Sequence, residues 1–121
     1  MVDDHEIVRQ GVRRILEMQG HWEIVGEAAN GEAALRMTRQ LKPDAIIMDI
    51  TMPVMGGIEA AARIVKQDPE SKVLIFTMHD PGVVLRQIQR AGAKGVLTKS
   101  RAASELGTAL ETILAGQTYF H

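Results

Sequence analysis

Four short, mostly apolar runs recur along the chain, and segments with the apolar spacing of helices separate them. The runs are residues 23–28, 45–48, 73–77 and 95–98. They lie close to Gly, Pro, Asn or Asp, and most are rich in Ile and Val, which is typical of strands. Strands that alternate with helices of about 10–15 residues predict right-handed βαβ crossovers and a parallel sheet covered on both faces. We therefore predict a doubly wound α/β domain, and the near-continuous apolar strands agree because both faces of such a sheet are buried.

The remaining segments predict helices. Residues 31–41 and 81–91 are two of them, with Asn30 suited to an N-cap and Pro81 to a first helical turn. Three others place apolar residues on one face. These faces are Val8, Val12, Ile15 and Leu16 in the first helix, Ile58, Ala61, Ala62 and Val65 in the third, and Leu106, Leu110, Ile113 and Leu114 in the last.

One element of the alternation is short. The first helix should follow a strand, but only Met1 and Val2 precede Asp3. A typical strand has about five residues. We therefore expect the first strand to be truncated in this sequence or to form only a stub.

Length and composition exclude several classes of function. A chain of 121 residues is one domain by the usual prior, so we treat residues 1–121 as a single domain. No apolar run approaches the roughly 20 residues that span a bilayer, and no signal peptide opens the chain, so we expect no membrane segment. The chain has no cysteine, which excludes disulfides and thiolate metal sites, and cytoplasmic is the default location. A net charge of −1 without a basic block argues against nucleic-acid binding by this chain alone.

Polar residues gather where the predicted strands end. Asp3 and Asp4, Asp49, Thr77 and Lys99 stand at these positions, and ligands of open parallel sheets bind beyond the carboxyl ends of the strands. Crowded carboxylates repel one another, and a divalent cation usually keeps them ionised. Oxygen ligands without His or Cys favour Mg²⁺. A carboxylate beside Mg²⁺, a lysine and a hydroxyl is what an acceptor of a phosphoryl group needs.

Each of these residues also has an ordinary structural explanation. Asp3 and Asp4 suit the cap of the first helix, Asp49 suits a turn, and a lone lysine such as Lys99 is most often solvated. His79 is better explained as a surface residue than as a metal ligand, since no second His has ligand spacing. The combination at four strand ends, in this order, favours a functional site.

Five stretches of sequence carry a resemblance to a known family. They are "VDDHEIVRQGVRRIL", "GEAANGEAAL", "PDAIIMDITMPVMGGIEA", "VLIFTMHD" and "AGAKGVLTKS". Together they resemble the receiver domain of two-component response regulators over nearly the whole chain. These motifs are most similar to those of the LuxR/NarL-type subfamily, whose full members carry a C-terminal helix-turn-helix DNA-binding domain. The resemblance implies a flavodoxin-like fold with a five-stranded sheet in the order 2-1-3-4-5.

By that resemblance, Asp49 accepts a phosphoryl group from a histidine kinase. The Mg²⁺ ligands implied are the carboxylates of Asp4 and Asp49 and the backbone carbonyl of Thr51, with Asp3 acting partly through water. Thr77 and Lys99 would contact the phosphoryl group. Pro53 and the paired Gly56 and Gly57 would shape the loop that follows Asp49 so that its backbone reaches the metal.

The resemblance also implies a signalling switch and not an enzyme with turnover, since a receiver domain catalyses only its own phosphorylation and dephosphorylation. Thr51 and His79 lie two residues after Asp49 and Thr77, and we expect them to modulate the lifetime of the phosphorylated form. Phosphorylation is expected to change the surface of the fourth helix and fifth strand and to favour a homodimer. Many receivers place Phe or Tyr where this chain has Val96, three residues before the lysine. Control of transcription would pass through a C-terminal DNA-binding domain that this chain does not contain.

Three other interpretations remain open at this point. A receiver-like interaction module that is never phosphorylated has the same fold. A Mg²⁺-dependent aspartyl phosphatase of the haloacid-dehalogenase type also uses a strand-end Asp, but it places a second Asp where this chain has Thr51. A flavin-binding flavodoxin-like module would need a phosphate loop after the first strand, where Asp3 and Asp4 would repel a flavin phosphate.

Overall fold

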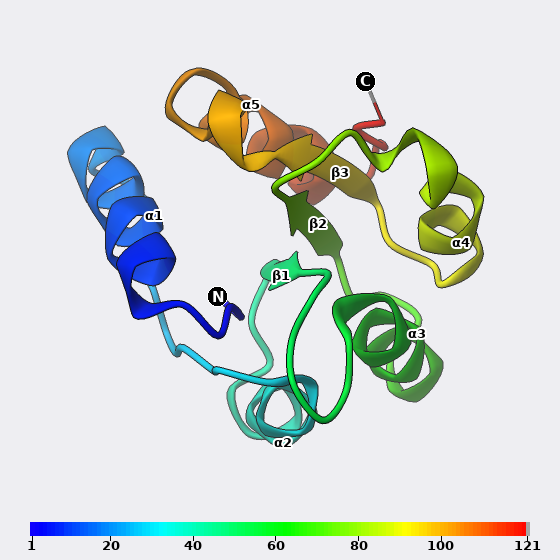
Figure 1. Cartoon of the computed structure of the whole chain (residues 1–121). Helices are drawn as coiled ribbons and strands as arrows, with labels where there is room; N and C mark the ends of the chain where they lie inside the picture. The colour runs from blue at the N-terminus through cyan, green and yellow to red at the C-terminus, as the bar shows by residue number, and fades with distance from the viewer. Residues whose placement is uncertain (121) are drawn as a thin grey trace.

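A parallel sheet lies between two layers of helices in the computed structural model, which describes residues 1–120 (Figure 1). The sheet contains β1 (Ile46–Asp49), β2 (Val73–Thr77) and β3 (Gly95–Thr98), in that spatial order. The helices are α1 (Glu6–Gln19), α2 (Gly31–Leu41), α3 (Gly57–Gln67), α4 (Leu85–Arg90) and α5 (Ala102–Leu114), and two 3₁₀ turns, η1 (Pro81–Val83) and η2 (Lys99–Arg101), precede α4 and α5. The predicted alternation of strands and helices is confirmed.

Both faces of the sheet are apolar and covered by helices. Successive residues of a strand point to opposite faces. One face packs against α2, α3 and α4, and its core includes Met48, Ile75 and Ile64. The other face packs against α1 and α5, and its core includes Leu74 and Leu106. Figure 1 shows α1 and α5 on one side of the strands and α2 and α3 on the other, which is the doubly wound arrangement that the sequence predicts.

Beyond β1 the sheet continues through isolated bridges. Val2 bridges in parallel to Met48 on one side and to Ala28 on the other. The amide of Val2 donates to the carbonyl of Ile47 (2.7 Å), and the amide of Asp3 donates to the carbonyl of Ala28 (3.0 Å). The spatial order is therefore Ala28, Val2, β1, β2 and β3, which corresponds to the predicted 2-1-3-4-5. The first strand is present only as the bridge at Val2, as expected.

The predicted strand at residues 23–28 is wrong over most of its length, because only Ala28 of this segment forms a bridge. A strand needs a neighbour to supply hydrogen bonds to its backbone. The neighbour here is residues 1–3, which reach Gly26 and Ala28 and no further. Residues 23–25 therefore stay outside the sheet although their sequence favours a strand.

The predicted helix at residues 81–91 is divided into η1 and α4. Val84 separates the two pieces, with φ −107° and ψ 6°, outside the α-helical region. Gly82 and the β-branched Val83 and Val84 are weak helix formers, which accounts for the break. Pro81 occupies the first turn of η1, as predicted.

Two further predictions about helices have opposite outcomes. Asn30 is the N-cap of α2, and its side-chain oxygen accepts a hydrogen bond from the amide of Ala33 (2.9 Å). In α3, however, the predicted face is wrong at Ala62, which is exposed. The buried residues of α3 include Ala60 and Ile64, because this helix packs against both α2 and the sheet.

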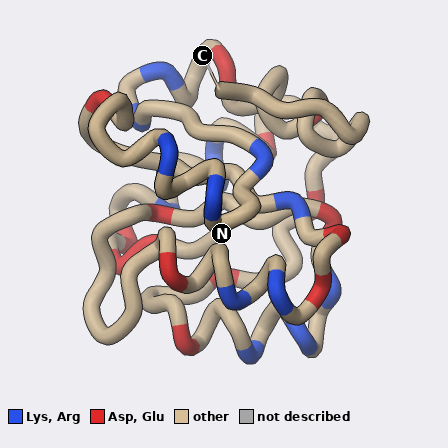
Figure 2. The backbone as a smooth tube through the Cα atoms, turned by 90° about the vertical axis from the view of Figure 1, so that its right-hand side faces the viewer, with Lys and Arg blue, Asp and Glu red and all other residues tan. Residues whose placement is uncertain are grey.

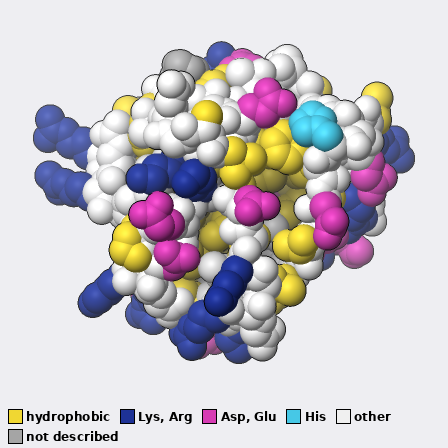
Figure 3. All heavy atoms as spheres, turned by 180° about the vertical axis from the view of Figure 1, so that it is seen from behind, with side chains coloured by type: hydrophobic (Ala, Val, Ile, Leu, Met, Phe, Trp, Pro, Cys, Tyr) yellow, Lys and Arg dark blue, Asp and Glu magenta, His cyan; other side chains and the backbone are white. Residues whose placement is uncertain are grey.

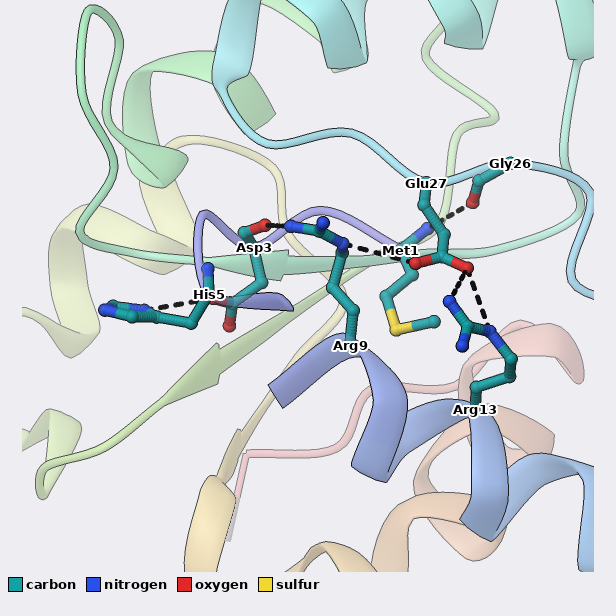
Figure 4. A network of polar contacts seen from close by, with 7 residues as sticks. All are labelled: Met1, Asp3, His5, Arg9, Arg13, Gly26 and Glu27. Atoms are coloured by element: carbon teal, nitrogen blue, oxygen red, sulfur yellow. Dashed lines mark hydrogen bonds and ion pairs between the residues drawn. The ribbon is translucent and has the colours of Figure 1, made fainter. Parts of the chain in front are cut away.

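An ion-pair network fastens α1 to the segment before α2 (Figure 4). Arg9 and Arg13 both bind the carboxylate of Glu27, with Arg9 Nε 3.2 Å from Oε1 and Arg13 Nε 3.0 Å from Oε2. Arg9 also donates a hydrogen bond to the backbone carbonyl of Asp3. Hydrogen bonds from Arg13 lower the pKa of Glu27 below its usual range, and Arg9 adds to this effect. The network therefore ties Asp3 to a fixed part of the fold.

The residues after α5 return to the sheet. Tyr119 bridges to Gly95, the amide of Val96 donates to the carbonyl of Tyr119 (2.9 Å), and the amide of Tyr119 donates to the carbonyl of Lys94 (2.9 Å). The buried ring of Tyr119 packs into the core, and its hydroxyl donates to Glu105. This segment covers the edge of β3 that would otherwise be open to pairing.

Charged residues of both signs are interspersed along the backbone (Figure 2). This agrees with the small net charge of the sequence. Among residues 1–120, no helix has the length and apolar character needed to cross a membrane.

Candidate functional site

Strand register brings polar residues together at one edge of the sheet. Asp49 ends β1 and pairs with Phe76, while Thr77 ends β2 and pairs with Thr98. Lys99 follows β3 directly. Because the strands are parallel, these three chain positions meet at the same edge.

The ammonium of Lys99 joins two buried carboxylates. Its Nζ lies 2.8 Å from Oδ2 of Asp3 and 3.2 Å from Oδ1 of Asp49. The side chains of Asp3 and Asp49 are only 3% and 7% exposed, and that of Lys99 is 11% exposed. Nζ also lies 5.8 Å from the centre of the Phe76 ring, which is within cation–π range. The pairing is therefore a buried ion pair and not a solvated surface contact.

Burial raises the pKa of the Asp49 carboxyl above its usual range, and the nearby Asp3 carboxylate raises it further. Lys99 opposes both effects but does not cancel them. A carboxylate in this state holds its charge at a cost, which a second cation in the site would reduce.

Asp4 and His5 complete the acidic cluster. One oxygen of Asp4, Oδ1, is buried and accepts no hydrogen bond from any residue that the structure describes. Nδ1 of His5 lies 3.1 Å from this oxygen and 3.4 Å from Oδ1 of Asp3. The amide of His5 also donates to Asp3 (2.8 Å). The sequence reasoning did not assign His5, although its place directly after the acidic pair was a usable signal.

The cluster fits a small divalent cation. Ligand atoms of Asp3, Asp4, His5 and Asp49 all lie within 4.8 Å of one another. Two ligands of one Mg²⁺ lie at most about 4.2 Å apart, twice the bond length of roughly 2.1 Å, so a small inward adjustment would suffice. The buried oxygen of Asp4 without a hydrogen bond is what such an ion would satisfy.

Three predicted residues form no ion pair with this cluster, namely Thr77, Thr51 and His79. Thr77 is buried, and its Oγ1 accepts a hydrogen bond from the amide of His79 (3.3 Å). The side chains of Thr51 and His79 are exposed on the loops that follow β1 and β2. The structure brings Asp3, Asp4, Asp49 and Lys99 into one cluster. Thr77 ends the neighbouring strand β2, and within residues 1–120 Thr51 and His79 form no hydrogen bond or ion pair with the cluster's charged groups.

The loop after Asp49 folds back tightly onto β1. The amide of Gly57 donates to the carbonyl of Ile50 (2.7 Å). A Cβ on Gly57 would lie 1.8 Å from the carbonyl oxygen of Asp49, so only glycine fits there. Within this loop, exposed Val54 has a φ of 71°, which is strained for a β-branched residue. The start of α3 is therefore in van der Waals contact with the backbone that carries Asp49.

Comparison with known proteins gives the family of this site. The family described as the response regulator receiver domain matches residues 1–111. The chain belongs to that family. Among curated relatives, this receiver domain is 39% identical over 119 residues to the response regulator UvrY of Escherichia coli (strain K12), covering 98% of this chain and 55% of UvrY. It is 36% identical over 121 residues to the transcriptional regulatory protein DegU of Brevibacillus brevis, covering 100% of this chain and 51% of DegU.

Solved structures agree on fold and subfamily. A LuxR-family two-component response regulator from Aurantimonas sp. SI85-9A1 is 44% identical, with a TM-score of 0.93 over 98% of this chain and 84% of that one. The signal receiver domain of NarL from Mycobacterium tuberculosis is 34% identical, with a TM-score of 0.90 over 96% of this chain and 94% of that one. The predicted flavodoxin-like fold and the likeness to LuxR/NarL-type receivers are confirmed. The chain spans about half the length of the curated relatives it matches.

The contact between Gly57 and Asp49 predicts a large effect of a single methyl group. Gly57→Ala should destabilise the receiver domain by about 3 kcal/mol or more, because its Cβ would overlap a backbone oxygen that cannot move away. Gly11→Ala in α1 is the matched control, since nothing lies within 4 Å of its Cβ, and it should stabilise by about 0.5–1 kcal/mol. Urea unfolding of both variants measures the difference, and equal stabilities would contradict the close approach.

The raised pKa of Asp49 predicts that neutralising it stabilises the metal-free protein. Because the folded state holds the Asp49 proton more tightly than the unfolded state, ionisation costs stability as pH rises through the folded pKa. At pH 7 in EDTA, Asp49→Asn should therefore be more stable than wild type. The gain should shrink as pH falls below the folded pKa and vanish below the ordinary pKa of Asp. Exposed Asp44, mutated to Asn, is the control and should change little; a destabilised Asp49→Asn at pH 7 would refute the assignment.

Proposed function

We propose that this receiver domain is a phosphorylation-activated switch in which Asp49 accepts a phosphoryl group from a histidine kinase in the presence of Mg²⁺. One observation carries the proposal: a buried carboxylate at the tip of β1 is held by Lys99, and the unsatisfied oxygen of Asp4 belongs to the same cluster. Membership of the receiver family supports it.

The chemical step follows from the groups in the cluster. Lys99 contacts Oδ1 of Asp49 and so leaves the second oxygen for attack. That oxygen forms a bond to phosphorus while the bond from phosphorus to the kinase's histidine nitrogen breaks, and the electron pair goes to the imidazole. The product is an acyl phosphate on Asp49. Lys99 and the hydroxyl of Thr77 are the residues we assign to the phosphoryl oxygens.

The proposed Mg²⁺ ligands are the carboxylates of Asp4 and Asp49 and the backbone carbonyl of Thr51, with Asp3 reaching the ion partly through water. When bound, the ion would neutralise charge on the phosphoryl oxygens. Asp3 has a second task, because its contact with Lys99 keeps that ammonium in place when Asp49 is modified.

The alternatives differ in their support. The phosphatase and flavin interpretations lose support, since the receiver family matches residues 1–111. A receiver that interacts with partners but is never phosphorylated shares the family and the fold. Phosphorylation of the isolated chain separates that interpretation from the proposal.

Incubation with acetyl phosphate and Mg²⁺ should add one phosphoryl group per chain, labile in base as acyl phosphates are. Asp49→Asn should take up none, because the nucleophilic oxygen is replaced by an amide. Asp44→Asn, on the exposed segment before β1, is the matched control and should be labelled as wild type. Intact-mass measurement reads all three, and a labelled Asp49→Asn variant would refute the proposed site.

Thr51 and His79 are proposed to modulate the lifetime of the acyl phosphate. Both are exposed, on the loops that follow Asp49 and Thr77, where we expect an attacking water to approach. Exchanging the two side chains should alter the rate of dephosphorylation severalfold and leave the extent of labelling at one per chain. Loss of the phosphoryl group is followed by mass over time, and an unchanged rate would remove both residues from this role.

The proposed output is a change in the surface of α4 and β3 that favours a homodimer, with DNA bound through a C-terminal domain outside this chain. Val96 is buried and β-branched, so it cannot swing as an aromatic switch residue would. The change would instead start at Thr77 and pass to η1. Sedimentation of the phosphorylated protein should show a larger species than that of the unmodified protein, and identical profiles would exclude dimerisation as the output.

A further inference from the structure

His5 brings an imidazole to the carboxylate cluster. A ring nitrogen of His5 and carboxylate oxygens of Asp3, Asp4 and Asp49 all lie within 4.8 Å of one another. Among residues 1–120, no second group of three or more such side chains gathers its ligand atoms in this way. On the face seen in Figure 3, for example, acidic side chains are scattered among basic, apolar and uncharged ones. A metal ion in the cluster would therefore meet a nitrogen atom as well as oxygen atoms.

The spacing of the His5 ring from the carboxylates is that of ligands around one ion. Nδ1 lies 3.1 Å from Oδ1 of Asp4 and 3.4 Å from Oδ1 of Asp3. Metal–ligand bonds of roughly 2.1 Å place neighbouring ligand atoms about 3.0 Å apart at the octahedral angle and about 3.4 Å apart at the tetrahedral angle. The ring therefore needs no large movement to bind an ion together with Asp3 and Asp4.

The short contact between His5 and Asp4 is not a hydrogen bond. Oδ1 of Asp4 is buried and accepts no hydrogen bond from any residue that the structure describes, although Nδ1 of His5 lies 3.1 Å away. A protonated imidazole normally donates to a carboxylate this close. Ligands of one ion point at the ion and not at one another, so the missing hydrogen bond agrees with a shared ligand sphere.

The backbone fixes the start of the His5 side chain. His5 is the N-cap of α1 in an extended conformation (φ −102°, ψ 114°), and its amide donates to Oδ1 of Asp3 (2.8 Å). Figure 4 shows the ring beside Asp3, whose other oxygen, Oδ2, contacts Lys99. The His5 side chain is 67% exposed. The ring is thus anchored next to the carboxylates and remains accessible to an ion that arrives from solvent.

We propose that His5 is a metal ligand through Nδ1, and that it gives the site a preference for a borderline divalent cation of the first transition series, such as Zn²⁺, over Mg²⁺. Carboxylate oxygens and water suit Mg²⁺, whereas an imidazole nitrogen suits Zn²⁺, Ni²⁺ and Cu²⁺. This role rests on the metal-binding part of the proposed function and is independent of phosphorylation. Both kinds of ion would use Asp4 and Asp49, so they would compete for one site.

The preference is measured as the ratio of the Mg²⁺ to the Zn²⁺ dissociation constant. His5→Asn is the informative variant, because the side-chain oxygen of Asn reaches close to the position of Nδ1 and replaces a nitrogen ligand by an oxygen ligand. Asn is also a favoured N-cap, so α1 should form as in wild type. Calorimetric titration of the 121-residue protein with each ion should give a ratio about tenfold or more lower in His5→Asn, mainly through weaker Zn²⁺ binding.

Two further variants serve as controls. His21 is also an exposed histidine, but it pairs with Glu111 (3.3 Å) and is not part of the cluster, so His21→Asn should keep the wild-type ratio. Asp4→Asn should weaken the binding of both ions, because both use its carboxylate. A Zn²⁺ affinity that Asp4→Asn leaves unchanged would put that ion elsewhere and refute the proposal.

An alternative role for His5 predicts a different result. If the ring is only a counter-cation for Asp3 and Asp4 and leaves when a metal binds, His5→Asn should strengthen the binding of Zn²⁺ and Mg²⁺ alike. The ratio of the two dissociation constants would then stay the same. An unchanged ratio overturns the proposal, and so does a wild-type protein that binds Mg²⁺ but not Zn²⁺.

Nitrogen NMR of the His5 ring identifies the ligand atom. In the Zn²⁺ complex, Nδ1 should carry no proton and Nε2 should keep its proton, because a metal-bound ring nitrogen must offer its lone pair. The signals are assigned by their absence from the spectrum of His5→Asn. A proton on Nδ1 in the Zn²⁺ complex would contradict the assignment.

Labelling with acetyl phosphate tests the proposed function separately. If wild type is phosphorylated on Asp49 while His5→Asn leaves the ratio unchanged, only the role of His5 is wrong. If the ratio falls as expected but wild type takes up no phosphoryl group, His5 remains a metal ligand and the proposed phosphorylation is wrong.

Discussion

The ion pair of Lys99 with Asp3 and Asp49 is the constraint on which the rest of the site depends. Two buried carboxylates share one ammonium, at 2.8 and 3.2 Å. Such pairs are tolerated only when their geometry is good, because removing charges from water is costly. That geometry requires Asp3, which follows the Val2 bridge, to lie at the same edge of the sheet as the ends of β1 and β3. The register of the sheet is therefore as much a part of the site as the side chains, and the remaining acidity of the cluster favours a second cation.

The site is also continuous with α3, and this gives it a mechanical connection. Gly57 begins that helix and lies against the carbonyl of Asp49, with no space for a side chain. Under the proposed function, a change in charge or bonding at Asp49 would act directly on a packed helix and on the loop that contains the strained Val54. Rigid contacts of this kind have few intermediate positions, which suits a two-state switch.

The sequence predicted the features that depend on a local pattern of residues. It failed for features that depend on contacts with another segment of the chain. The three paired strands, the Asn30 cap and the family were all predictable from apolar periodicity, turn residues and motifs. The strand at residues 23–28 was not, because its formation depends on a partner strand that reaches only Gly26 and Ala28. Ala62 was misplaced because α3 packs on both α2 and the sheet. His5 directly follows the acidic pair, which was a usable signal, but its contact with Asp4 also depends on how the chain turns into α1.

Residues 1–3 connect the carboxylate cluster to the sheet. The amide of Asp3 donates a hydrogen bond to the carbonyl of Ala28, and Arg9 donates one to the carbonyl of Asp3. A cation bound at Asp3 and Asp4 would reduce the freedom of this segment further. The Val2 bridge and the cation would then favour one another, because each lowers the entropic cost of forming the other.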